Sequence, residues 1–548
     1  MKRRNFIKLS ATATAIGLLP LELKAMLKQL SINECDFSNR KIILVNLAGA
    51  NDGLNTIVPL NQYDTYSNLR PNIRIPETGL HKYITLDSTL ANNQQIGLNP
   101  SMTGFKSLYD QGWLRIIQAV GYPSQNKSHF ASTDVYLTGN DGNSWLNGSD
   151  SGWIGRYMEL YYQNELNATY PLAVQIGSKN TSLGFHGINE HGMALNITGQ
   201  DVSGFYSVLS GLAGEPPQNI PNSHYGTELD YIIQTDNLSN QYSQAISNAF
   251  DNGTNGSNYP DTDLGDQLKT VAKLISGGLS SKVYMVSISG FDTHNNKIEI
   301  ARNPNGKHSN LLNELSSAIE IFFNDLDNQG LANDIVGVTY SEFGRKAAEN
   351  GNLGTDHGEI SPMFVFGKPI QGGVSGTNPD LTEATSSNNF QIDTVQHDYR
   401  ETFTTLLQNF LGASDAIVDS AFFNNSETIS FTESKINDLI KTSFEVPITC
   451  YGEVLNIDGI KKNKVELFPN PFTTSINLKG SYELKYFNKY EVYNLSGQLI
   501  KKGELVYNLS NSISINLESL SNDVYLLKII SKGIIDNYQS DVFKILKN

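Results

Sequence analysis

The chain has 548 residues, which is more than one domain requires, and roughly 400 residues remain when its two distinctive ends are set aside. It carries 55 acidic and 40 basic residues, for a net charge of −15, and no basic run follows the first few residues. We therefore expect neither nucleic acid nor an anionic membrane surface as a partner. Its two cysteines exclude a disulfide framework and a cysteine metal site. In an oxidising compartment, a bond between Cys35 and Cys450 would tie the ends of the large domain together.

The N-terminus has the layout of an export signal. Lys2, Arg3 and Arg4 precede a short apolar run over 9–19, which is well under the roughly 20 residues of a membrane span. The string Arg-Arg-x-Phe-Ile-Lys over 3–8 resembles a twin-arginine signal, which a receptor reads and which does not anchor a protein in lipid. We expect a signal peptide over 1–30, transit through the periplasm, and a product that is not an integral membrane protein.

Residues 36–445 alternate between short Val- and Ile-rich runs and longer segments of helical period. This pattern predicts an α/β domain with a doubly wound, mostly parallel sheet. The predicted strands are 41–47, 114–120, 172–176, 283–287, 335–339 and 363–366. The predicted helices include 264–279, 311–326 and 399–411.

Acidic residues and histidines follow several of these strands, at the edge where open α/β sheets bind ligands. The candidate metal ligands are Asp52, Asp292, His294, Glu342, Asp356 and His357. Carboxylate oxygens mixed with imidazole nitrogens suit zinc, manganese or a related divalent ion, and two ions could clamp an ester undergoing displacement. Each motif alone is weak, because Asp-Gly is usually a turn and a buried histidine is usually hydrogen-bonded core.

Hydroxyl and guanidinium groups complete the predicted site. Ser128 is the candidate nucleophile and Ser124 is the alternative, although residues 128–130 also fit a turn with a helix cap. Arg345 and Arg400 are candidates for binding an anionic group, and pairing with surface carboxylates is the competing interpretation.

The texture changes again near the C-terminus. After a predicted linker over 446–463, residues 464–548 alternate in short segments separated by Asn, Gly and Ser, which predicts an all-β sandwich. The predicted strands are 465–468, 475–478, 490–493, 513–516 and 524–530. Three motifs occur in order at 467–472 (LFPNPF), 490–498 (YEVYNLSGQ) and 520–529 (LSNDVYLLKI). They resemble the C-terminal sorting domain of type IX secretion, which implies that the type IX machinery is a partner.

Motifs of the large domain resemble the DUF1501 family. They are 47–56 (LAGANDGLNT), 128–130 (SHF), 152–157 (GWIGRY), 291–294 (FDTH), 341–345 (SEFGR), 355–358 (TDHG) and 398–400 (DYR). The resemblance places the domain near the alkaline phosphatase and sulfatase superfamily. The pattern of that superfamily is an Asp after the first strand, a Ser or Thr nucleophile, and two later sets of Asp and His.

Transferred to this chain, the resemblance implies that Asp52 binds metal and Ser128 is the nucleophile. Asp292 and His294 would then serve one ion, and Asp356 and His357 the other. The usual Asp-x-x-x-His spacing is compressed to Asp-x-His at 292–294, and Glu342 is the acid that directly follows its strand. A last histidine ligand is open between His308, with a helix cap as the alternative role, and His397, with a surface position as the alternative.

Two hypotheses follow. The first is a secreted, metal-dependent hydrolase of phosphate or sulfate esters, which the ordered set of carboxylates and histidines supports. The second is a non-catalytic secreted binding or assembly protein that retains the fold, which the imperfect ligand spacing supports.

Overall fold

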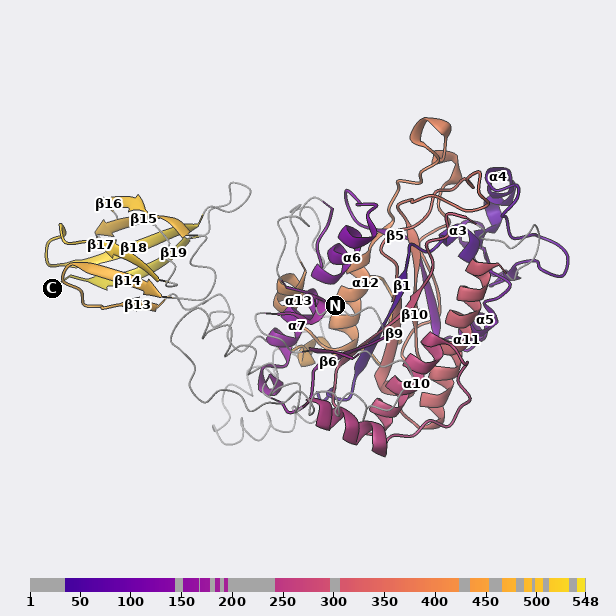
Figure 1. Cartoon of the computed structure of the whole chain (residues 1–548), viewed down its shortest axis with the longest axis horizontal. Helices are drawn as coiled ribbons and strands as arrows, with labels where there is room; N and C mark the ends of the chain where they lie inside the picture. The colour runs from indigo at the N-terminus through magenta and orange to yellow at the C-terminus, as the bar shows by residue number, and fades with distance from the viewer. Residues whose placement is uncertain are drawn as a thin grey trace, which may run out of the picture. The chain divides into compact units, whose positions relative to one another are not determined.

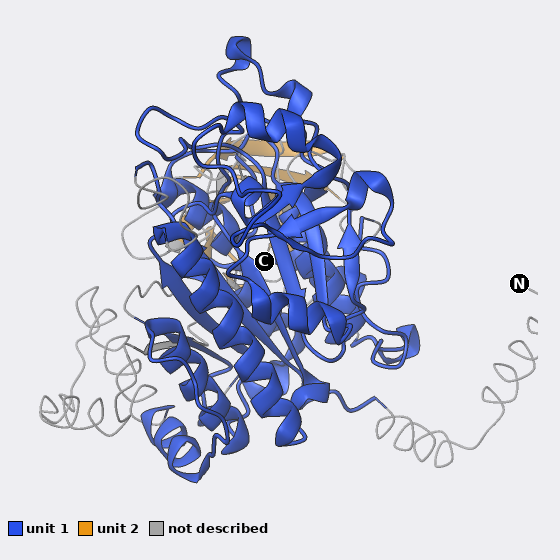
Figure 2. Cartoon of the chain, turned by 90° about the vertical axis from the view of Figure 1, so that its right-hand side faces the viewer, with its two compact units in different colours: residues 1–453 blue, residues 454–548 orange. Residues whose placement is uncertain are grey.

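A computed structural model describes the chain as two compact units, residues 1–453 and 454–548 (Figure 2). The described residues are 35–142, 151–166, 168–177, 183–187, 192–195, 242–295, 306–422, 434–452, 466–479, 487–494, 498–505, 512–531 and 540–547. The predicted signal peptide over 1–30 lies outside them. None of the described helices combines the length and apolar content that a membrane span needs.

A central sheet organises the first unit. In the described part of the chain it has nine strands, in the order β11-β5-β10-β9-β1-β8-β6-β7 with β12 beside β5. Their bounds are β1 Lys41–Ala48, β5 Leu114–Gly121, β6 Ala173–Ile176, β7 Gly192–Leu195, β8 Val283–Ser289, β9 Ile335–Tyr340, β10 Ser361–Phe366, β11 Gly373–Ser375 and β12 His397–Asp398. All pairings are parallel except those of β10 with β5 and with β9. The carboxyl ends of β1, β5, β8 and β9 therefore meet at one edge.

Helices cover both faces of this sheet (Figure 1). One group is α5 Thr103–Asp110, α10 Asp263–Ser276 and α11 Lys307–Asn328. The other is α6 His129–Thr138, α7 Trp153–Tyr161, α12 Tyr399–Thr405 and α13 Asp415–Ala421. This arrangement confirms the predicted doubly wound, mostly parallel α/β fold.

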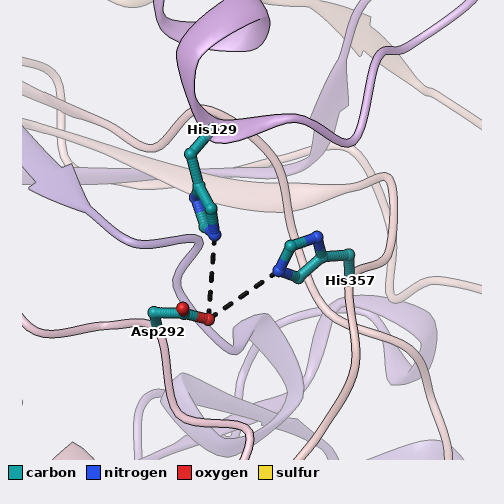
Figure 3. Close-up of side chains that lie close together, drawn as sticks. All are labelled: His129, Asp292 and His357. Atoms are coloured by element: carbon teal, nitrogen blue, oxygen red, sulfur yellow. Dashed lines mark ion pairs between the residues drawn. The ribbon is translucent and has the colours of Figure 1, made fainter.

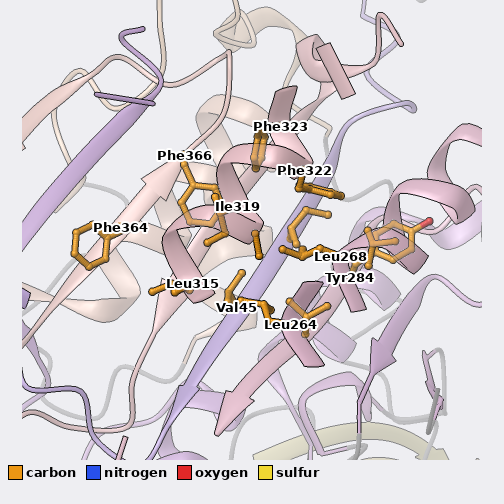
Figure 4. Close-up of a cluster of buried hydrophobic side chains, with 14 of the residues drawn as sticks. Val45, Leu264, Leu268, Tyr284, Leu315, Ile319, Phe322, Phe323, Phe364 and Phe366 are labelled. Atoms are coloured by element: carbon orange, nitrogen blue, oxygen red, sulfur yellow. The ribbon is translucent and has the colours of Figure 1, made fainter. Parts of the chain in front are cut away.

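The helix sequences explain their burial. In α10, apolar residues recur from Leu264 to Leu268 and Val271, and the Thr262 side chain caps the helix by accepting from the Gly265 N–H. Figure 4 shows Leu264 and Leu268 in a buried cluster with side chains of α11 and the sheet, including Phe322. Each fully buried side chain of this kind contributes about 1.5–3 kcal/mol to folding.

Smaller elements surround the carboxyl edge. They are α3 Gly53–Thr56, β2 Ile57–Pro59, α4 Tyr63–Leu69, β3 Ile84–Thr85 and β4 Ile96–Leu98. The strands among them form a separate sheet in the order β2-β4-β3. The helix predicted over 399–411 is divided, because a π-helical turn, Leu406–Phe410, follows α12.

A disulfide joins Cys35 to Cys450, which confirms the predicted bond. The linker predicted over 446–463 begins with residues that pack on the large unit. Val446 is buried and its N–H donates to the Asn409 carbonyl, while the Gly452 N–H donates to the Gly412 carbonyl. Residues 453–465 lie outside the described residues.

The second unit is all β, as predicted. Its strands are β13 Glu466–Phe468, β14 Ser475–Lys479, β15 Phe487–Asn494, β16 Leu499–Glu504, β17 Ser512–Asn516, β18 Val524–Ser531 and β19 Ser540–Leu546. They form two sheets, β13-β14-β17 and β16-β15-β18-β19, around a hydrophobic core of their own. The sequence does not predict β16 or β19.

Candidate metal centre

Three side chains meet at the carboxyl edge of the central sheet: His129, Asp292 and His357. Asp292 follows β8, His129 is the first residue of α6 after β5, and His357 lies between β9 and β10. Because these strands end at the same edge, residues more than 200 positions apart in the chain become neighbours (Figure 3).

The turn after β1 makes room for this meeting. Gly49 has a φ of +117°, and a Cβ atom built there would lie 2.4 Å from the Asp292 nitrogen. Only glycine permits both the conformation and the close approach. The loop that carries Asp292 can therefore pass directly over the end of β1.

One carboxylate oxygen is the centre of the cluster. Asp292 Oδ1 lies 3.7 Å from His129 Nε2, 3.7 Å from His357 Nε2 and 3.1 Å from His294 Nε2. The His294 and His357 Nε2 atoms are 2.9 Å apart. Asp292 is 49% exposed and His294 is 42% exposed, so solvent reaches the cluster.

The outer nitrogen of each imidazole faces an oxygen that accepts a hydrogen bond. His129 Nδ1 is 2.7 Å from Glu342 Oε1, His357 Nδ1 is 2.9 Å from the Lys127 carbonyl oxygen, and His294 Nδ1 is 3.4 Å from Asp356 Oδ1. In the neutral rings, these contacts hold the proton on Nδ1 and leave a lone pair on Nε2. Three imidazole lone pairs and a carboxylate oxygen therefore converge on one point.

Packing holds two of the rings in place. The ring of Phe343, which is fully buried, lies 4.8 Å from that of His129 and 4.7 Å from that of His357, centre to centre. Because Phe343 follows Glu342 at the end of β9, one short segment both packs His129 and orients it.

Arg345 supplies the positive charge next to this cluster. Its Nη2 donates to Asp292 Oδ1 at 2.7 Å, and its Nη1 is 3.4 Å from His294 Nε2. Its remaining contacts are to the backbone carbonyls of Gly49, Ala50, Phe291 and Thr355. The guanidinium is buried and its donors are directed at protein acceptors, so the predicted role of Arg345 in binding a substrate anion is not supported.

These surroundings change the ionisation of three groups. Burial raises the pKa of Asp292, but the hydrogen bond and charge of Arg345 outweigh it and bring the pKa below its usual value. The Asn350 hydrogen bond is the main cause that lowers the pKa of Asp356. Burial, with the charge of Arg345 as a smaller cause, lowers the pKa of His357. The carboxylates are thus ionised and His357 is neutral at pH 7, which are the forms that bind metal.

The residues present fit a divalent ion. Zinc bonds of about 2.0–2.2 Å at tetrahedral angles separate neighbouring ligand atoms by about 3.3–3.5 Å. The ligand atoms of His129, Asp292 and His357 all lie within 4.8 Å of one another. In addition, His129 Nε2 is buried and has no hydrogen-bond partner among the described residues. A cation at the centre would satisfy this atom.

Several predicted site residues lie outside the cluster. The predicted ligand Asp52 is instead in a buried ion pair, because both of its oxygens accept from Arg70, at 2.7 and 2.9 Å. The predicted anion-binding Arg400 is held by both carboxylate oxygens of Asp398, at 2.8 and 2.7 Å, in another buried pair. In each pair, desolvation makes the opposite charge the preferred partner.

The two open histidines are also occupied elsewhere. His308 Nε2 lies 3.0 Å from Asn51 Oδ1 in the core, and His397 Nδ1 lies 3.0 Å from Glu401 Oε2. Neither belongs to the cluster.

Ser128 is exposed and is the N-cap residue of α6, but its side chain makes no capping hydrogen bond. Its N–H donates to Asn126 Oδ1, and no contact joins its hydroxyl to the cluster among the described residues. The alternative Ser124 is exposed in a left-handed conformation, with a φ of 54°.

Two assignments change within the cluster itself. Glu342, a predicted ligand, contacts the outer nitrogen of His129 and does not face the centre. His129 is a ligand candidate that the sequence analysis did not name. The available signal was its position directly after the β5 strand and its loop, the same signal that selected Asp292 and His357.

The fold and the cluster together define a mostly parallel α/β protein with a candidate metal centre at the carboxyl edge of its sheet. Residues 274–415 belong to the family described as a protein of unknown function (DUF1501), and residues 466–538 match the secretion system C-terminal sorting domain. Both resemblances are thereby confirmed. No curated protein matches the chain. The sorting domain supports export to the cell surface or the extracellular space.

Solved structures similar to the chain include three with low scores. A protein in the alkaline phosphatase superfamily from Vibrio parahaemolyticus has 12% identity over 61% of this chain and 62% of its own, less than two thirds, with a TM-score of 0.26. A structure connected with glycosaminoglycan metabolism by Bacteroides thetaiotaomicron has 12% identity over 85% and 89%, with a TM-score of 0.32. A mutant of alkaline phosphatase PafA has 10% identity over 56% and 63%, with a TM-score of 0.25. Scores this low carry no argument about the site.

Proposed function

We propose that the protein is a secreted, metal-dependent hydrolase of phosphate or sulfate esters. The observation that carries this proposal is the convergence of three imidazole Nε2 atoms on Asp292 Oδ1, with the outer nitrogen of each ring facing an acceptor. The ester class rests on the resemblance of the sequence motifs and not on the geometry. We also propose a twin-arginine route into the periplasm, followed by type IX export.

His129, Asp292 and His357 are the residues that would hold zinc or manganese. A catalytic zinc site has three protein ligands and one open position, and these three side chains supply that number. The bound ion would polarise the ester and lower the pKa of a water molecule.

His294 has a different role in this proposal. Its Nδ1 faces Asp356, so its Nε2 is a proton acceptor beside the fourth position, 3.1 Å from Asp292 Oδ1. This nitrogen takes the proton of the attacking water, a function that contributes about 10²–10⁴-fold to a rate. Ser128 is the alternative nucleophile.

Metal analysis and an ester panel test this assignment. We expect purified protein to contain about one zinc or manganese ion per chain and to hydrolyse p-nitrophenyl phosphate or p-nitrophenyl sulfate. His129→Ala should lose both metal and activity, whereas His294→Ala should keep the metal and lose activity. The matched control His397→Ala removes a histidine outside the cluster and should change neither. Unchanged activity in His129→Ala would contradict the ligand assignment, and loss of activity in Ser128→Ala would favour the serine nucleophile.

The second candidate is a non-catalytic binding or assembly protein. The observation that favours it is Arg345, whose charge already compensates Asp292 without an ion. Protein that binds no divalent metal at micromolar concentration would support this candidate over the hydrolase.

A further inference from the structure

Glu342 and His129 form a buried pair whose geometry has a consequence for the proposed metal centre. His129 has two different faces: its Nδ1 lies 2.7 Å from Glu342 Oε1, and its Nε2 points toward Asp292 Oδ1 at 3.7 Å. The second distance is too long for a hydrogen bond. Only the contact with Glu342 therefore decides which nitrogen carries the proton.

Glu342 is held more firmly than a surface carboxylate. Its side chain is 5% exposed, and its Oε1 also accepts from the Gly49 N–H at 2.8 Å. Ser341 Oγ is 3.4 Å from Oε2. The carboxylate is thus anchored to the turn after β1, and it cannot rotate toward the centre without leaving Gly49 without its acceptor.

We propose that Glu342 is a positioning residue that fixes the Nδ1–H tautomer and the ring orientation of His129, so that Nε2 is available to a metal ion. This inference rests on the proposed function, because it assumes that the cluster binds metal. Outer carboxylates of this kind typically change metal affinity by 10–100-fold when they are removed.

The two variants Glu342→Leu and Glu342→Gln separate positioning from charge. Leucine removes the acceptor, so we expect zinc affinity of the full-length protein, measured by competition with a chelator, to fall about 10–100-fold. Glutamine keeps an acceptor oxygen for His129 and should retain most of the affinity. The control Glu349→Leu removes a carboxylate that accepts from the Asn72 and Ile73 N–H groups, outside the cluster, and should leave zinc affinity unchanged.

A spectroscopic measurement tests the tautomer without a variant. In zinc-free protein labelled with ¹⁵N at its histidines, the His129 ring should show a protonated Nδ1 and an unprotonated Nε2 at pH 7.5. Glu342→Leu should shift the His129 signals toward the opposite tautomer.

The outcomes are distinct. Wild-type protein that binds no zinc would contradict the proposed function and with it this inference. Wild-type protein that binds zinc, together with Glu342→Leu protein of equal affinity, would overturn the positioning role alone. A wild-type His129 ring protonated on Nε2 and not on Nδ1 would also overturn it, even if Glu342→Leu failed to fold.

Discussion

His357 illustrates how single residues depend on their surroundings in this site. Its Nδ1 lies 2.9 Å from the Lys127 carbonyl oxygen, and burial together with the nearby Arg345 charge lowers its pKa from 6.5. A histidine that stays neutral in the folded protein but is protonated in the unfolded chain makes folding sensitive to pH.

We therefore predict that metal-free protein loses stability as the pH falls. The contribution of His357 is complete above pH 6.5, the usual value, and it is lost as the pH falls toward the lower pKa of the folded state, because the unfolded state then binds more protons. Urea unfolding in the presence of a chelator between pH 5 and pH 7.5 measures this effect. His357→Gln should reduce the slope of unfolding free energy against pH, and identical slopes for both proteins would contradict the interpretation.

At the scale of elements, the ends of β1, β8 and β9 come together through backbone contacts. The Gly290 and Phe291 N–H groups both reach the Ala48 carbonyl, and the Gly49 N–H reaches Glu342. The position of the Asp292 loop is thus set by the turn that follows β1.

Gly49→Ala should disturb this junction. The substitution combines an unfavourable φ of +117° with a Cβ atom 2.4 Å from the Asp292 nitrogen, so we expect the free energy of unfolding to fall by about 1–3 kcal/mol or more, with loss of zinc binding. Gly79→Ala is the matched control, since Gly79 has a φ of +92° but no heavy atom within 4 Å of the added carbon. Equal zinc affinity in both variants would show that the close approach at Gly49 is not required.

At the scale of the whole molecule, the chain combines two units with separate hydrophobic cores. The disulfide belongs to the larger one. It joins Cys35, before the first strand, to Cys450, after the last packed helix, across 415 residues. A bond that closes so long a loop restricts the unfolded chain strongly.

Cys35→Ser should lower the unfolding free energy of the large unit by about 2–5 kcal/mol. Denaturant unfolding under non-reducing conditions measures this loss, and the double variant Cys35→Ser/Cys450→Ser should match the single one because either change removes the bond. Mass spectrometry of non-reduced peptides that found two free thiols in the wild-type protein would contradict the pairing.

The sequence by itself determined the α/β class, most of the sheet strands, the cysteine pair and the secretion module. These features follow from local periodicity, from turn residues and from the few cysteines available. It also indicated which residue types lie at the carboxyl edge, because strand ends can be read directly from the pattern. The strands β16 and β19 escaped prediction, since Leu499–Glu504 carries several charges and Ser540–Leu546 follows a polar segment without a clear boundary.

Only the tertiary structure decided which of those edge residues act together. Asp52 and Asp292 both follow strands, yet Asp52 is neutralised by Arg70 in the core while Asp292 faces three imidazoles. The two faces of His129 depend on Glu342, which is 213 residues away. Side-chain direction and ion pairing are set by contacts between distant segments, and local sequence patterns do not contain them.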